Sequence, residues 1–75
     1  MKYGPKDIGD LVRKSRKALG VTQQALALSA GTGTRFIGDL EKGKETCEFG
    51  KVLTVLHTLG IKLKLIAPSI PGQEK

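Results

Sequence analysis

The sequence predicts a mainly α-helical fold, with four helices and a short β-strand in one compact domain over residues 1–66 and a flexible tail at 67–75. Three observations predict this class. A length of 75 residues suffices for one domain. Apolar residues recur at spacings of three and four up to residue 59, with glycines interrupting the pattern. After residue 60 the repeat changes to two, which is typical of a half-buried strand.

The first helix is expected at residues 6–19, because its inward positions follow the spacing of one helical face. Pro5 suits the start of a helix and Gly20 suits its end. The inward positions are Ile8, Leu11, Val12, Ser15 and Leu19.

Three shorter helices are expected at residues 23–30, 33–42 and 47–59. Each follows a threonine that can cap a helix, namely Thr22, Thr32 and Thr46. Glycine ends the segments at 23–30 and 47–59, and Lys42-Gly43 ends the segment at 33–42. Their inward positions are Leu26, Ala27, Ala30, Ile37, Leu40, Phe49, Val52, Leu53, Leu56 and Leu59.

A strand is expected where apolar and charged side chains alternate, at Ile61, Lys62, Leu63, Lys64, Leu65 and Ile66. One strand cannot satisfy its own backbone groups, and no other segment has the pattern of a strand. We therefore expect these residues to pair with the same strand of a second copy across a two-fold axis, which makes a homodimer. The alternatives are a frayed extension and a continuation of the fourth helix past Gly60.

Composition narrows the class of partner. The net charge of +6 suits a polyanion, with +4 on residues 1–20, zero on 21–46 and +2 on 47–75. The absence of Trp, with one Tyr and two Phe, argues against stacking on single-stranded nucleic acid. A single cysteine, Cys47, excludes a disulfide framework and a multi-cysteine zinc site, and we expect no metal. No apolar run approaches the ~20 residues of a membrane helix, so we expect no membrane association.

The segment 21–44 has the spacing of a helix-turn-helix motif. Counting from Gln23, a small residue comes four positions later at Ala27, and a glycine comes eight positions later at Gly31. The small residue lets two helices cross closely, and the glycine tolerates the positive φ of a tight turn. Apolar residues three, seven, fourteen and seventeen positions after Gln23 attach both helices to the core, at Leu26, Ala30, Ile37 and Leu40. The helix at 33–42 is then the recognition helix.

The stretch Leu19–Gly43 resembles the phage-repressor (Xre) family of DNA-binding domains, whose form is LGxTQxxLAxxAGxxxxxIxxLExGK. Thr22-Gln23 and Leu40-Glu41-x-Gly43-Lys44 make the resemblance specific. It implies an ion pair between Arg16, late in the first helix, and Glu41, at the end of the third. We expect a largely buried fork that fixes the register of the two helices. The alternative is two solvated charges.

The same resemblance implies binding to double-stranded DNA. The start of the second helix would contact a phosphate, and the start of the third would enter the major groove. Arg35 is the strongest candidate for reading a base, because a guanidinium can bridge O6 and N7 of guanine. Asp39 either accepts a hydrogen bond from a cytosine amine or holds Arg35 four residues earlier, and we favour the second. The expected contacts are Thr22, Gln23, Gln24, Gly33, Thr34, Arg35, Asp39, Lys42, Lys44 and Thr46.

A repressor-like domain followed directly by LGIKLKLIAP resembles the HipB-like antitoxins. This resemblance implies a dimer that binds an inverted-repeat operator, represses its own operon and binds a HipA-like serine/threonine-kinase toxin. The alternatives are a free-standing Xre-type regulator and a protein-interaction module without DNA binding. We expect no enzyme and no cofactor, because the sequence has no nucleophile beside a base, no carboxylate pair and no phosphate-binding glycine loop. Such a regulator would be cytoplasmic and associated with the nucleoid.

Overall fold

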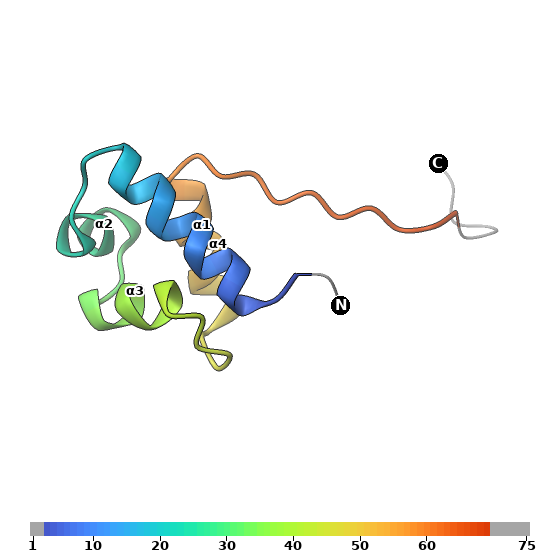
Figure 1. The fold of residues 1–75 in the computed structure, drawn as a ribbon, viewed down its shortest axis with the longest axis horizontal. Coiled ribbons are helices and arrows are strands. Elements are labelled where there is room, and N and C mark those ends of the chain that lie inside the picture. The colour runs from blue at the N-terminus through green and yellow to red at the C-terminus, as the bar shows by residue number, and fades with distance from the viewer. Residues whose placement is uncertain (1–2, 70–75) are drawn as a thin grey trace.

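The computed structural model describes residues 3–69, which contain four α-helices. They are α1 (Pro5–Ala18), α2 (Gln23–Ala30), α3 (Thr34–Glu41) and α4 (Phe49–Thr58), packed into one globule (Figure 1). The predicted mainly helical class with four helices is confirmed. The bounds of α2 match the prediction, and the other helix ends differ from it by one or two residues. Residues 70–75 of the expected tail lie outside the described residues.

The starts of α3 and α4 differ from the prediction. The N-cap of α3 is Gly33 and not Thr32. Because glycine has no side chain, α3 begins without a capping hydrogen bond from a side chain. The N-cap of α4 is Glu48, and not Thr46, because α4 begins two residues later than predicted. The Glu48 carboxylate accepts a hydrogen bond from the backbone N–H of Lys51 at 2.7 Å. A carboxylate at this position combines capping with a favourable interaction with the helix dipole, which a threonine hydroxyl lacks.

The tight turn between α2 and α3 is centred on a left-handed glycine. Gly31 has φ of +71° and follows the last residue of α2. The next N–H, that of Thr32, donates to the Ala27 carbonyl at 2.9 Å and closes the end of the helix. At the other end of α2, the Thr22 hydroxyl accepts a hydrogen bond from the Ala25 N–H at 3.0 Å. Both ends of α2 therefore follow from local sequence chemistry.

The core receives side chains from all four helices. α3 packs against both α1 and α2, and α2 also packs against α4. The buried apolar residues are Val12, Leu26, Ala27, Ile37, Leu40, Val52, Val55 and Leu56. Four residues that we expected to face inward are exposed instead, by between 38% and 63%: Leu11, Leu19, Phe49 and Leu53. The apolar face of α1 and α4 is wider than the surface that the short α2 and α3 cover, so its edges remain in solvent.

The close approach of α1 and α3 depends on Gly9, a buried residue inside α1. A Cβ atom built on Gly9 would lie 2.9 Å from the backbone oxygen of Glu41, and closer still to that of Leu40. Any larger side chain would therefore push α1 away from the end of α3. Sequence analysis did not identify this position.

Residues 61–69 leave the helices as an extended segment (Figure 1). Within the described chain the predicted strand at 61–66 is not formed, because no second strand lies beside it. The N–H of Ile61 still donates to the Leu56 carbonyl at 2.8 Å, and Gly60, with φ of +76°, turns the chain out of α4. The alternative of a longer fourth helix is therefore wrong. Leu65 and Ile66 are more than 80% exposed.

Candidate nucleic-acid interface

A buried ion pair joins α1 to the end of α3. The Nε atom of Arg16 donates to Oε2 of Glu41 at 2.6 Å, and its Nη2 atom donates to Oε1 at 3.1 Å. Both residues are less than 10% exposed. The planar guanidinium and the carboxylate thus form a two-point fork, which fixes the relative orientation of the two helices as well as their distance.

A third side chain completes this network. The Nε2 atom of Gln23, at the start of α2, donates to Oε1 of Glu41 at 3.0 Å. The Nη1 atom of Arg16 donates to the backbone carbonyl of Val21 at 2.8 Å. Among the residues that the structure describes, no buried side-chain polar atom lacks a partner. One carboxylate of α3 therefore holds side chains of both α1 and α2.

The electrostatics of Glu41 follow from these contacts. Burial alone would raise the pKa of the Glu41 carboxyl. The hydrogen bonds from Arg16 and Gln23, with the positive charges of Arg16 and Arg13, outweigh burial and leave this pKa below its usual value. The hydrogen bond to Glu41 in turn raises the pKa of Arg16 against the effect of burial. Glu41 is therefore a carboxylate at neutral pH.

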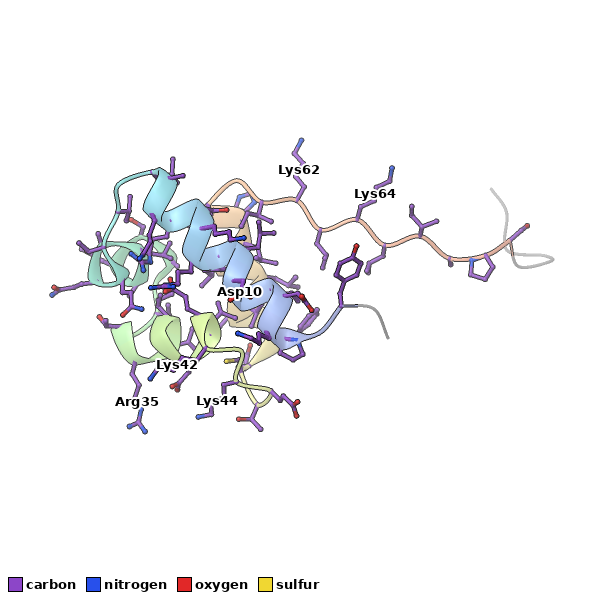
Figure 2. The ribbon with its side chains drawn as sticks, in the orientation of Figure 1. Asp10, Arg35, Lys42, Lys44, Lys62 and Lys64 are labelled. Carbon is purple, nitrogen blue, oxygen red and sulfur yellow. The ribbon has the colours of Figure 1, made fainter. Side chains whose placement is uncertain are left out.

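Ile37 and Leu40 attach α3 to the core, where both are buried. The other side of α3 therefore faces solvent. Arg35 is exposed on the opposite face, and Thr34 is exposed at the start of the helix. Figure 2 shows Arg35 projecting from the start of α3, away from the extended segment 61–69. Among the described residues Arg35 makes no side-chain hydrogen bond or ion pair, so its guanidinium is available for a ligand.

Asp39 pairs with a different residue from the one that we favoured. Its Oδ2 atom lies 3.4 Å from Nζ of Lys44, in the loop after α3, and it makes no ion pair with Arg35. An arginine placed four residues before an acid is the less favourable order for a pair on a helix. The loop instead brings Lys44 back over the last turn. Asp39 thus positions a lysine and leaves Arg35 unconstrained.

The remaining candidate residues lie at the edges of the same surface. Thr22 and Gln24 are exposed at the start of α2, where the first N–H groups of the helix have no intrahelical acceptor. Lys42, Lys44 and Thr46 are exposed at the end of α3 and in the following loop. Gly33 is exposed directly before α3. Gln23 differs from these residues, because its side chain is engaged with Glu41. The sequence spacing contains no signal for that contact.

Two further observations limit the chemistry of the described residues. Within residues 3–69 no group of three or more His, Cys, Asp or Glu side chains is placed to hold a metal ion. None of the helices in this part of the chain has the length and apolar character needed to cross a membrane.

The fold and this surface define a helix-turn-helix domain, in which α2 and α3 flank the turn at Gly31. No family model matches the sequence. A curated relative, the uncharacterized HTH-type transcriptional regulator y4mF of Sinorhizobium fredii, is 55% identical over 64 residues, which are 85% of this chain and 84% of that protein. The chain belongs to the HTH-type transcriptional regulators and carries an Xre-like helix-turn-helix.

Solved structures agree with this family. A chain from the structure of a HipA-HipB-O2-O3 complex superposes with a TM-score of 0.79 at 20% identity, over 92% of this chain and 97% of its own length. The restriction-modification controller protein C.AhdI from Aeromonas hydrophila gives a TM-score of 0.68 at 26% identity, over 77% of this chain and 84% of its own. The HipB likeness, at 20% identity, establishes the shared fold.

Proposed function

We propose that this DNA-binding regulator represses transcription from its own promoter, as the antitoxin of a HipA/HipB-like toxin-antitoxin module. The observation that carries DNA binding is the exposed, unpaired Arg35 on a recognition helix that Arg16 and Glu41 hold in place. Arg35 reads guanine in the major groove, while the start of α2 and Lys44 contact phosphates on either side. The protein then acts on the nucleoid, in the cytoplasm.

The operator in this proposal is an inverted repeat bound by a homodimer. The apolar side chains of residues 63–66 are poorly covered in a single chain, with Leu63 49%, Leu65 85% and Ile66 82% exposed, which supports pairing of two such segments. In this dimer the segments 61–66 of the two copies pair as antiparallel strands. The two recognition helices are then related by a two-fold axis. The half-sites are then about one helical turn (~10 bp), or a multiple of it, apart.

The proposed partner is a HipA-like serine/threonine-kinase toxin. Its support is the likeness to a chain found in a HipA-HipB-O2-O3 complex. A kinase-like reading frame beside the gene, and co-purification of its product with this chain, are expected. A regulator that is retained on its operator but binds no such kinase would instead be a free-standing Xre-type regulator.

A band-shift titration on the DNA upstream of its own gene tests DNA binding. The Arg35→Ala variant is expected to weaken cognate binding by about 1–3 kcal/mol and to relax the preference at one base position. Lys44→Ala is expected to weaken binding to all sequences alike and to lower the salt slope by about 1. If Arg35→Ala binds the cognate site as tightly as the wild type, the proposed docking is wrong. If the wild type binds no duplex at any salt concentration, the chain is a protein-interaction module.

A further inference from the structure

A polar cleft of about 480 Å³ opens between α1 and the helix-turn-helix. It is lined by Lys6, Asp10, Arg13, Gln23, Gly38, Glu41 and Lys42. Asp10 on α1 and Lys42 at the end of α3, both labelled in Figure 2, line this same cleft. The three residues from α1 are not among the DNA contacts that the sequence predicts. The cleft therefore extends the candidate interface onto a helix outside the helix-turn-helix.

The positive charge of the cleft is only partly neutralised. Glu41 is paired with Arg16 at 2.6 Å, and Asp10 lies 3.9 Å from Lys6. Within residues 3–69 the side chains of Arg13 and Lys42 form no ion pair and no hydrogen bond. Each carboxylate of the cleft thus has a cation of its own, and two further cations remain. This arrangement favours an anion with several acceptor oxygens.

The cleft is also continuous with the expected path of DNA. Gln23 marks the start of α2, where the helix dipole attracts a phosphate, and Lys42 follows the recognition helix. Gly38 also lines the cleft and adds no side chain to it. Apart from its chain neighbours and the backbone of its own helix, a Cβ at Gly38 would approach one atom of the described residues within 4 Å, Oε1 of Gln23 at 3.9 Å. The floor of the cleft is therefore open beside the recognition helix.

We propose that this cleft seats a backbone phosphate of the bound DNA, held by Arg13 and Lys42. The proposal rests on the proposed function and adds α1 to the DNA contacts. The Arg13 guanidinium donates two parallel hydrogen bonds to the phosphate oxygens, and Lys42 acts as a mobile point charge. Lys6 exchanges its exposed partner Asp10 for the phosphate at little cost, because such surface pairs contribute little. The excess positive charge of the first twenty residues then has a defined role.

The test compares two neighbouring cations of α1. Arg13→Ala removes a residue that lines the cleft, and Lys14→Ala removes an exposed charge that does not line it. Binding of the wild type and both variants to the upstream duplex is measured by fluorescence anisotropy between 50 and 200 mM salt. Loss of one phosphate contact lowers the slope of log K against log salt by about 0.9. The affinity deficit of Arg13→Ala should therefore shrink about 3.5-fold over this range, while that of Lys14→Ala stays nearly constant.

Two additional arms separate the explanations. The double variant Arg13→Ala, Lys42→Ala should lower the slope by about 1.8, with a circular-dichroism melting curve like that of the wild type. Equal slope changes in Arg13→Ala and Lys14→Ala would overturn the proposal. Titration with inorganic phosphate tests whether the cleft binds a free anion instead of DNA. The proposal would also be overturned if phosphate saturates the cleft at micromolar concentration while Arg13→Ala leaves the salt slope on duplex DNA unchanged. A wild type that binds no duplex would refute the proposed function itself, which is a different result.

Discussion

Two glycines inside helices are expected to respond in opposite ways to alanine. At Gly38 a Cβ has ordinary contacts only, so alanine changes little except helix propensity, which favours it by about 0.8–1.0 kcal/mol. At Gly9 the same atom would enter the space of the backbone oxygens of Leu40 and Glu41. Overpacking of this kind costs about 1–3 kcal/mol, and backbone carbonyls at the end of a packed helix cannot rotate away. With the propensity gain of about 1 kcal/mol deducted, we expect Gly9→Ala to lose up to about 2 kcal/mol.

Thermal unfolding followed by circular dichroism measures both changes. For a domain of this size each kcal/mol shifts Tm by about 4–8 °C. We therefore expect Gly38→Ala to melt about 4–8 °C above the wild type, and Gly9→Ala to melt below it by up to about 8–16 °C. All proteins are compared at one concentration, because association would make Tm depend on concentration. If Gly9→Ala melts above the wild type, the close approach of α1 to the end of α3 is incorrect.

Three further predictions concern the ion pair and the extended segment. Glu41→Ala should lower the free energy of unfolding by about 3–5 kcal/mol, because it leaves the Arg16 charge buried without its partner. A thermal midpoint within a degree of that of the wild type would contradict this. Because the folded-state pKa of Glu41 lies below its unfolded value, its stabilisation is present above that unfolded value and is lost as pH falls through the folded pKa. Urea midpoints between pH 7 and pH 2 should therefore fall less steeply in Glu41→Gln than in the wild type. Leu63→Pro should yield a monomer in analytical ultracentrifugation, whereas Ala67→Pro, beyond the strand, should not; a dimeric Leu63→Pro would exclude this interface.

The parts of the fold that the sequence predicts well depend on local chemistry. The bounds of α2 follow from Thr22 as its cap and Gly31 as its left-handed end, both within a residue of the helix. The burial of Leu26, Ile37 and Leu40 follows from their spacing in the helix-turn-helix. Periodicity identifies the apolar face of a helix, but it does not reveal how much of that face a neighbouring helix covers. For this reason Leu19 was expected inside and lies in solvent.

Contacts between elements were harder to predict than the elements themselves. Resemblance to the Xre family suggested Arg16 as the partner of Glu41, whereas nothing in the spacing suggests that Gln23 shares the carboxylate. The helical spacing favours Arg35 over a cytosine amine as the partner of Asp39, but Lys44 in the following loop pairs with it instead. Gly9 has only the weak sequence signal of a poor helix former. In each case the missing information is the three-dimensional path of a second element.

The network around Glu41 has a thermodynamic consequence for DNA recognition. One carboxylate on α3 accepts hydrogen bonds from α1 and from α2, so the helix that we propose to enter the groove and the start of α2 that we propose to contact a phosphate are joined before any ligand arrives. Rigid docking of these two surfaces requires little loss of chain entropy. The heat-capacity change of binding should then match the surface buried at the interface alone, without the larger negative change that folding of the helix-turn-helix on DNA would add.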